Sequence, residues 1–148
     1  MTLSAPISRN NRIKIVDVMT GDPLTVTSSE SVGKADELMS ENSIRQIPVV
    51  DGRELVGIVT DRDIRSFLSD GLLTDLDVRE KRLASSVAAI MTPEPVCVAP
   101  DDDLQDAVEL LVEQKFGAIP VVDEAEGLVG IVSYVDVLRC FLNRLQEE

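Results

Sequence analysis

The 148-residue sequence contains no histidine and no tryptophan, and aromatic residues make up only 3% of it. Without histidine, the chain lacks the side chain that most often serves as a general base or a metal ligand at neutral pH. It also contains no GxSxG, Walker A or CxxC motif. Catalysis would have to rest on carboxylates and hydroxyls alone, so the sequence predicts a protein that is not an enzyme, requires no cofactor and has no metal site.

Basic residues are scarce, because 14 Lys and Arg stand against 27 Asp and Glu, which gives a net charge of -13. Such a charge repels nucleic-acid phosphates and anionic lipids. Apolar runs such as IPVV are far shorter than the roughly 20 residues of a membrane span, and the first twelve residues lack the apolar segment of a signal peptide. We therefore expect a cytoplasmic protein with neither nucleic acid nor membrane as a partner.

Cysteine is also rare. The two cysteines, Cys97 and Cys140, lie in apolar stretches and far apart in the sequence. Two such thiols are poor candidates for a disulfide framework or a metal site. The sequence predicts that both are buried and behave as small hydrophobic residues.

The sequence does contain an internal repeat. Met91 and Thr92 follow Met19 and Thr20 by 72 residues, and the same offset relates the two copies of IPVVD, at 47–51 and 119–123. One extra residue in the second copy then brings GIVTDRD at 57–63 into line with GIVSYVD at 130–136. With 44% hydrophobic residues, two such copies facing each other could bury a shared core.

Each copy is predicted to fold as β-α-β-β-α, which gives an α/β (α+β) protein of two related repeats. The short segments 24–26 and 96–98 are expected to be extended, and helices are expected at about 34–41 and 104–115. Two β-branched strands around a tight turn follow in each copy, and a second amphipathic helix closes it. The apolar residues that mark these closing helices are Ile64, Phe67 and Leu68 in the first copy and Val137, Leu138, Phe141, Leu142 and Leu145 in the second.

The helix starts are predicted from capping residues. Thr27 and Glu30 have the spacing of a capping box in the first copy, and in the second Pro100 opens the turn before Asp101 to Asp103. The acidic run suits a helix N-terminus, although it could bind a cation instead. The expected organisation is an N-terminal arm (1–12), a first repeat (13–69), a connector with at least one helical turn (70–84) and a second repeat (85–148).

The repeated motif G-x-x-[ST]-x-x-D combines three groups at the start of each closing helix. Thr60 and Ser133 would be N-caps, beside free backbone N–H groups that favour a phosphate. Asp63 and Asp136 could accept hydrogen bonds from a ribose diol, and Gly57 would allow close backbone approach. Alternatively, both motifs are capping boxes that need no ligand.

These motifs together give a specific resemblance. DVMT and AIMT, IPVVD twice and G-x-x-[ST]-x-x-D twice resemble a tandem pair of CBS domains, a Bateman module, over about Ile15 to Leu142. The resemblance implies a pseudo-two-fold disc of two units, each a three-stranded sheet with two helices, with ligand clefts between the units. It also implies binding of AMP, ADP, ATP or S-adenosylmethionine, dimerisation, and a regulatory role such as energy sensing. Because the chain has no room for an attached enzyme or channel, we expect either that its output passes to a separate effector protein or that the module acts as a free-standing sensor.

Carried over to this sequence, the resemblance assigns Asp63 and Asp136 to ribose and Thr60 and Ser133 to phosphate. It places adenine against 44–48 in one cleft and 116–120 in the other, with help from the backbone near Thr20 and Thr92. The full set of expected nucleotide-binding residues is Thr20, Ile44, Arg45, Gln46, Ile47, Pro48, Gly57, Thr60, Arg62, Asp63, Thr92, Phe116, Gly117, Ala118, Ile119, Pro120, Gly130, Ser133, Tyr134 and Asp136.

The two clefts are not expected to be equal. Arg62 and Arg65 belong to the first motif, whereas Tyr134, Val135 and Leu138 follow Ser133 in the second, so the first is expected to contribute more to phosphate binding. Arg45 is either a further phosphate contact or a solvated charge at the strand edge. Phe116 and Tyr134 could stack on adenine, or Phe116 could belong to the core.

An alternative without nucleotide remains open. The acidic composition also fits a Mg²⁺-responsive module or a dimerising scaffold with empty clefts. The helix at 104–115 has an apolar sector wider than packing against one sheet requires, which favours a dimer. Its members are Leu104, Ala107, Val108, Leu110, Leu111 and Val112.

Overall fold

The computed structural model describes residues 12–69 and 76–147. The first eleven residues of the predicted arm and residues 70–75 of the connector lie outside this part. The described elements, with 3-10 helices written η, are η2 (Ile15–Asp17), β1 (Thr20–Gly21), α1 (Val32–Asn42), β2 (Gln46–Asp51), β3 (Glu54–Thr60), α2 (Asp61–Leu68), α3 (Leu76–Leu83), η3 (Val87–Ala89), β4 (Thr92–Pro93), α4 (Leu104–Gln114), β5 (Ala118–Asp123), β6 (Gly127–Ser133) and α5 (Tyr134–Gln146).

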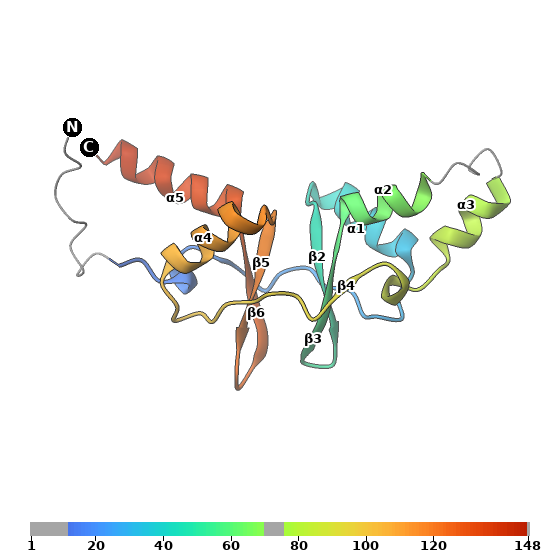
Figure 1. Ribbon diagram of the computed structural model, residues 1–148, viewed down its shortest axis with the longest axis horizontal. Helices are drawn as coiled ribbons and strands as arrows, with labels where there is room; N and C mark the ends of the chain where they lie inside the picture. Colours follow the sequence, from blue (N-terminus) through green and yellow to red (C-terminus); the bar gives the residue numbers. More distant parts are fainter. Residues whose placement is uncertain (1–11, 70–75, 148) are drawn as a thin grey trace.

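Two hairpins form the centre of the molecule. Figure 1 shows the antiparallel pairs β2–β3 and β5–β6 side by side, with the helices grouped at one end of them and the turns at the other. Both hairpins have the same register, with one irregularity at the equivalent points Val49/Val50 and Val121/Val122. The repeat predicted from the sequence is thus a structural repeat, and the mixed α/β fold of two related halves is confirmed.

The third strand of each three-stranded sheet comes from the other repeat. β1, near the start of the first repeat, pairs with β6 of the second, so that Thr20 lies opposite Ile131. β4, near the start of the second repeat, pairs with β3 of the first, so that Thr92 lies opposite Ile58. The two segments cross between the lobes in opposite directions (Figure 1). The Met-Thr pairs therefore lie on the sheet of the opposite repeat.

The hydrophobic cores follow the same exchange. Val87 of η3 is fully buried in the core built by α1, α2 and the β2–β3 hairpin. Ile15 of η2 is fully buried in the core of α4 and the β5–β6 hairpin. Burying such a side chain stabilises the fold by about 1.5–3 kcal/mol. The core of the first hairpin is therefore incomplete without η3, and the core of the second hairpin is incomplete without η2.

The helix starts differ in detail from the prediction. α1 is capped by Ser31, whose hydroxyl accepts a hydrogen bond from the Lys34 N–H, rather than by Thr27. Glu30 does accept a hydrogen bond from the Thr27 N–H, but in the turn before the helix. Asp102 makes the equivalent bond to the Ala99 N–H, and Asp103 is the N-cap of α4. The capping-box spacing therefore marks a turn that occurs in both repeats and immediately precedes the N-cap of each helix.

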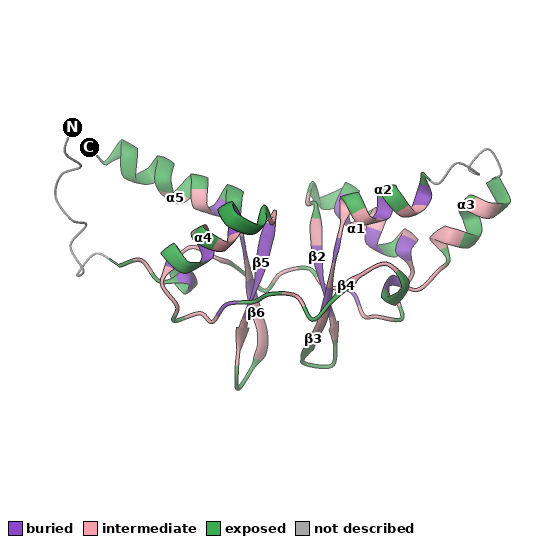
Figure 2. Cartoon of the chain, in the orientation of Figure 1, coloured by how far each residue is buried: buried purple, intermediate pink, exposed green. Residues whose placement is uncertain are grey.

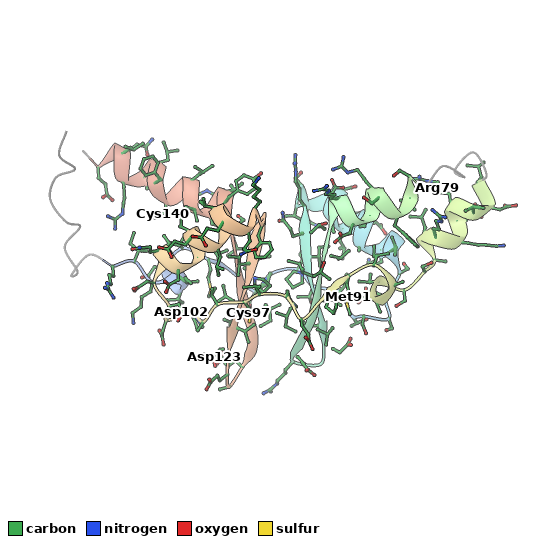
Figure 3. The ribbon with its side chains drawn as sticks, in the orientation of Figure 1. Arg79, Met91, Cys97, Asp102, Asp123 and Cys140 are labelled. Atoms are coloured by element: carbon green, nitrogen blue, oxygen red, sulfur yellow. The ribbon has the colours of Figure 1, made fainter. Side chains whose placement is uncertain are left out.

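The predicted burial of both cysteines is wrong. Cys97 is exposed and Cys140 is partly buried, and both are free thiols. The segment 96–98 makes only an isolated bridge, between Val98 and Val121, so of its three side chains only that of Val98 is buried. Figure 3 shows Cys97 on this crossing segment, beside the second hairpin.

The apolar surface predicted for the helix at 104–115 is used mostly inside the molecule, although Val112 is 70% exposed. Leu104, Ala107 and Leu111 are buried, because α4 packs against both β5 and α5. The exposed apolar face belongs to α5 instead, which is solvent-exposed along most of its length (Figure 2). Its members are Tyr134, Val135, Leu138, Phe141, Leu142 and Leu145, and we call them the α5 face.

The connector contributes more structure than one helical turn. α3 packs against α1 and α2, and the Arg82 guanidinium donates a hydrogen bond to the Phe67 carbonyl (2.7 Å) while lying 5.6 Å from the centre of its ring. In the described ranges, no helix combines the length and the apolar character that crossing a membrane requires.

Candidate functional site

Two equivalent clefts lie between the repeats at the N-termini of the closing helices, and each uses residues of both repeats. The first, which we call the α5 cleft, has a volume of about 530 Å³ and lies at the N-terminus of α5. Its walls come from that terminus, from β1, and from the first repeat. The sequence-predicted residues that line it are Thr20, Ile44, Arg45, Gln46, Pro48, Ala118, Ser133, Tyr134 and Asp136.

The second, the α2 cleft, has a volume of about 450 Å³ and is the counterpart at the N-terminus of α2. Its walls come from that terminus, from β4, and from the second repeat. The predicted residues that line it are Arg45, Gln46, Thr60, Arg62, Thr92, Phe116, Gly117, Ala118 and Pro120. Both volumes lie in the range of about 300–1,000 Å³ that is typical of small-molecule sites.

The hydroxyl and the carboxylate of each motif form a complete capping box. The Thr60 hydroxyl accepts from the Asp63 N–H (3.0 Å) while Asp63 accepts from the Thr60 N–H (3.0 Å). Ser133 and Asp136 make the same two bonds, at 3.2 and 2.9 Å. The structural role considered for these residues is thus real, and it also fixes the first helical turn with its remaining N–H groups beside the cleft.

The two aspartates differ in their further contacts. Asp136 is buried, lines the α5 cleft, and accepts additional hydrogen bonds from the hydroxyls of Thr20 and Ser133 (both 3.1 Å). Asp63 is half-buried and does not line the α2 cleft, and no described residue donates to its Oδ1. Thr20 therefore ties β1 to α5, whereas the equivalent Thr92 makes no such bond to Asp63 within the described residues.

The repeated glycines make room for protein rather than for a ligand. A Cβ on Gly57 would lie 2.6 Å from the Met91 sulfur and 3.0 Å from the Thr92 carbonyl oxygen. A Cβ on Gly130 would lie 2.5 Å from the Met19 sulfur and 2.9 Å from the Thr20 carbonyl oxygen. Both glycines are buried and line neither cleft. They let the exchanged Met-Thr segments, of which Met91 is labelled in Figure 3, lie directly on β3 and β6.

Two further predicted residues belong to the cores. Ile47 and Ile119 are fully buried and line neither cleft. Successive side chains of a strand point to opposite faces, so the neighbours of each isoleucine face the cleft while the isoleucine itself faces the helices. The stretches 44–48 and 116–120 were each expected to line one cleft, and the structure places all of their residues except Ile47 and Ile119 in the cleft walls.

Sequence reasoning missed cleft residues that repeat between the two copies. Asp22, Pro23 and Leu24 line the α5 cleft, and Glu94, Pro95 and Val96 line the α2 cleft at the equivalent positions. The 72-residue offset was the signal that could have found them. The others that line the α5 cleft are Asn42, Ser43, Ile131, Val135 and Arg139, and those of the α2 cleft are Ile58, Asp61, Arg65 and Lys115.

All four non-glycine residues with positive φ among the described residues line the clefts. They are Asp22 and Ser43 in the α5 cleft, with φ of 46° and 53°, and Glu94 and Lys115 in the α2 cleft, with φ of 47° and 57°. Left-handed backbone costs about 1–3 kcal/mol at such residues and tends to cluster at binding sites. Two such residues, at equivalent positions of the two repeats, thus shape each cleft.

Several acidic groups outside the clefts have protein partners. Asp103 pairs with Arg12 (3.1 Å) and Asp101 with Lys14 (3.7 Å), while Asp102 accepts from the Ala99 N–H. At the tip of the first hairpin, hydrogen bonds from the hydroxyl and the N–H of Ser28 lower the pKa of Asp51. Among the described residues, no three His, Cys, Asp or Glu side chains converge as metal ligands would.

Comparison with known proteins identifies the fold. The model of the CBS domain family matches the sequence twice, at residues 15–70 and 87–143. The chain belongs to the CBS-domain family. The two matches cover the two structural repeats, so the chain is a CBS-domain pair.

Relatives of this CBS-domain pair include stand-alone proteins and parts of larger ones. It is 32% identical over 123 residues to the CBS domain-containing protein YhcV of Bacillus subtilis, covering 83% of this chain and 81% of that protein. It is 38% identical over 116 residues to the inosine-5'-monophosphate dehydrogenase of Korarchaeum cryptofilum, which is 78% of this chain but 22% of the enzyme. The pair thus spans about a fifth of that enzyme's length.

Solved structures of CBS-domain pairs share the architecture. CBSX2 from Arabidopsis thaliana superposes with a TM-score of 0.80 at 32% identity, covering 92% of this chain and 99% of that one. A structure of CBSX2 in complex with AMP gives a TM-score of 0.75 at 34% identity and covers 88% and 96%. The CBS-domain pair of protein MJ0100, in complex with 5'-methylthioadenosine and S-adenosyl-L-methionine, gives 0.76 at 25% identity and covers 90% and 98%.

Proposed function

We propose that this CBS-domain pair is a regulatory rather than a catalytic module that binds an adenosine-containing ligand in the clefts between its repeats. AMP, ADP and ATP are the preferred candidates, and S-adenosylmethionine is a further one. The observation that carries the proposal is the construction of both clefts, in which a helix N-terminus with a hydroxyl cap faces an apolar wall supplied by the other repeat. A polar end and an apolar wall match the phosphate and the base of a nucleotide.

In the proposed binding mode, adenine lies against the strand that enters each cleft. Ile44 and Pro48 form this wall in the α5 cleft, and Phe116 and Pro120 form it in the α2 cleft. Where the ligand carries a phosphate, Ser133 or Thr60 and the first N–H groups of the helix bind it. Asp136 binds ribose in the α5 cleft. Asp63 does not line the α2 cleft, but no described residue donates to its Oδ1, which is the atom that we propose to bind ribose there. For Asp136 this requires the Thr20 hydroxyl to yield its hydrogen bond, so that ligand binding loosens the contact between β1 and α5.

We also propose that the chain forms a homodimer and signals to a separate effector protein. The α5 face supports the dimer, because Leu138, Phe141, Leu142 and Leu145 recur at helical spacing and are each more than half exposed. An arrangement that couples cleft occupancy to the helices would let the pair report cellular adenine nucleotide levels, which is energy sensing. A cytoplasmic location stays a prediction.

The alternative is a scaffold or a Mg²⁺-responsive module without nucleotide. It draws on the net charge of -13. The ion pairs of Asp101 and Asp103 with Lys14 and Arg12 weaken the support that the acidic run gave it.

Thermal unfolding in the presence of AMP, ADP, ATP, S-adenosylmethionine, NAD or Mg²⁺ alone tests the proposal. A ligand at about 100 times its dissociation constant stabilises the folded state by about 2.7 kcal/mol, or about 5–10 °C for a chain of this size. We expect such a shift with one or more adenosine ligands and a smaller shift in Asp63→Asn and Asp136→Asn proteins. Asp123→Asn is the matched control, because Asp123 lies at a hairpin tip outside both clefts. A shift with Mg²⁺ alone would support the alternative.

A further inference from the structure

The two clefts carry different charges. Four basic side chains (Arg45, Arg62, Arg65 and Lys115) and two acidic ones (Asp61 and Glu94) line the α2 cleft. Two basic side chains (Arg45 and Arg139) and two acidic ones (Asp22 and Asp136) line the α5 cleft. In a protein with a net charge of -13, the α2 cleft is therefore a local excess of positive charge, whereas the α5 cleft is balanced.

Ion pairing within the clefts increases this difference. In the α5 cleft Arg139 pairs with Asp136 (3.7 Å), and Asp136 is also held by three hydrogen-bond donors. In the α2 cleft Arg65 pairs with Asp61 (3.1 Å). No described carboxylate lies within ion-pair distance of Arg45, Arg62 or Lys115. Three cations at the α2 cleft are thus available to an anionic ligand.

The difference arises from the first turns of the two helices. Arg62 and Arg65 of α2 are equivalent to Val135 and Leu138 of α5 by the 73-residue offset. Both helix N-termini offer N–H groups, but α2 adds two guanidinium groups where α5 has apolar side chains, and guanidinium groups bind phosphate oxygens through charge-assisted hydrogen bonds. The corresponding side chains of α5 belong to the exposed apolar α5 face. The guanidinium of α5 that lines its cleft, Arg139, is paired with Asp136.

The two clefts share wall residues. Arg45 and Gln46 line each cleft, while the equivalent positions of the second repeat are Gly117 and Ala118. The Gln46 amide occupies the space that a Cβ on Gly117 would fill. The small residues of the second repeat thus make room for the larger ones of the first. Arg45 is one cation between two sites, and its carbonyl accepts from the Asp61 N–H (2.8 Å) at the start of α2.

We propose that the α2 cleft takes the phosphorylated ligand, an adenosine 5'-phosphate held by Arg45, Arg62 and Arg65, and that the α5 cleft takes an adenosine ligand without phosphate. Arg65 exchanges its exposed ion pair with Asp61 for the phosphate. This inference rests on the proposed function, because it assigns two ligand classes to the two proposed adenosine sites. Arg45 and Arg139 are the two basic residues that line the α5 cleft. When Arg45 binds a phosphate in the α2 cleft, only Arg139 remains for a ligand in the α5 cleft. The pair therefore distinguishes phosphorylated from unphosphorylated adenosine by the cleft in which each binds.

The test is isothermal titration of AMP and of adenosine into the wild-type protein, an Arg62→Gln/Arg65→Gln protein and an Arg139→Gln protein. The double variant is expected to bind AMP at least tenfold more weakly than the wild type, because it loses the charge-assisted hydrogen bonds of both guanidinium groups to the phosphate. Its affinity for adenosine is expected to change less than twofold. Arg139→Gln is the matched control in the α5 cleft and should leave AMP affinity within twofold.

Salt provides a second readout. Raising NaCl from about 50 to 500 mM shortens the Debye length from roughly 14 Å to about 4 Å, so AMP affinity of the wild type should fall while adenosine affinity stays constant. Thermal unfolding without ligand checks that the variants fold, and loss of the exposed Arg65–Asp61 pair costs at most about 1 kcal/mol.

Three results would overturn the inference. Equal loss of AMP and adenosine affinity in the double variant would mean that the arginines support the cleft rather than the phosphate. A larger loss of AMP affinity in Arg139→Gln would place the phosphate in the α5 cleft. Adenosine binding together with complete absence of AMP binding would remove the phosphate site but leave the adenosine module intact. If wild-type protein bound neither compound, the proposed function would fail first and the inference with it.

Discussion

At the scale of single residues, Gly57 decides how closely an exchanged strand can approach a repeat. Its Cα faces the Met91 sulfur and the Thr92 carbonyl, and the latter is backbone that has little freedom to move. A side chain there would push β4 away from β3 and carry Thr92 away from the wall of the α2 cleft.

Gly57→Ala is therefore expected to lower the free energy of unfolding by about 1–3 kcal/mol through overpacking. Urea denaturation followed by circular dichroism measures this. Gly21→Ala is the matched control on the equivalent exchanged strand, because a Cβ on Gly21 meets no heavy atom within 4 Å. Equal stability of the two variants would contradict the steric role assigned to Gly57.

Residue roles were predictable from the sequence where they depend on local spacing. The capping boxes of Thr60–Asp63 and Ser133–Asp136 follow from three-residue spacing at a helix start, and both are present. The glycine of the same motif was assigned to ligand approach, because the sequence does not tell which backbone will lie over it. Cys97 shows a similar limit, since an apolar segment with a single bridge leaves one of its faces in solvent.

At the scale of the elements, α5 differs from every other described helix in burying a charged residue, Asp136, but no apolar one. Its apolar side chains were correctly expected to form one stripe, and the helix at 104–115 was expected to supply the dimer surface. Periodicity gives the stripe but not its partner. α4 packs against β5 and α5 and buries Leu104, Ala107 and Leu111, while its Val112 stays exposed, so the larger uncovered stripe is the α5 face.

If the α5 face forms the proposed homodimer, a Leu138→Asp/Phe141→Asp protein should be monomeric, because two carboxylates would lose their hydration in the interface. Light scattering coupled to size exclusion measures the mass. Leu76→Asp is the control, since Leu76 is 75% exposed and lies on α3, away from the α5 face. The wild type eluting as a monomer at about 100 μM, or the double variant staying dimeric, would exclude this interface.

At the scale of the whole molecule, the exchange of segments joins the two repeats into one unit. Ile15 completes one core and Val87 the other, and β1 and β4 complete the opposite sheets. The internal repeat was plain in the sequence, as were the hairpins and the order of the helices. The exchange was not, because the 72-residue offset places each Met-Thr segment in a repeat without telling which of two nearly identical sheets it joins.

This exchange also explains why both clefts combine the two halves. The α5 cleft is lined by Thr20 and the start of β2 from the first repeat and by the N-terminus of α5 from the second. The α2 cleft is lined by Thr92 and the start of β5 from the second repeat and by the N-terminus of α2 from the first. A ligand in either cleft would therefore contact both repeats, and its binding would change the position of one repeat relative to the other. The charges that distinguish the clefts, in contrast, follow from a few substitutions between otherwise equivalent positions, of which Arg62 and Val135 are one pair.

The central claim is that the clefts between the repeats bind an adenosine ligand, and titration of AMP into ¹⁵N-labelled protein tests it most directly. We predict that the amide signals which move belong to residues lining the clefts, such as Gln46, Thr60, Ala118 and Tyr134, while those of Asp51 and Asp123 at the hairpin tips stay in place. Mg²⁺ alone should leave the cleft signals unchanged. A spectrum that AMP leaves unaltered at millimolar concentration, or changes confined to residues outside both clefts, would contradict the account.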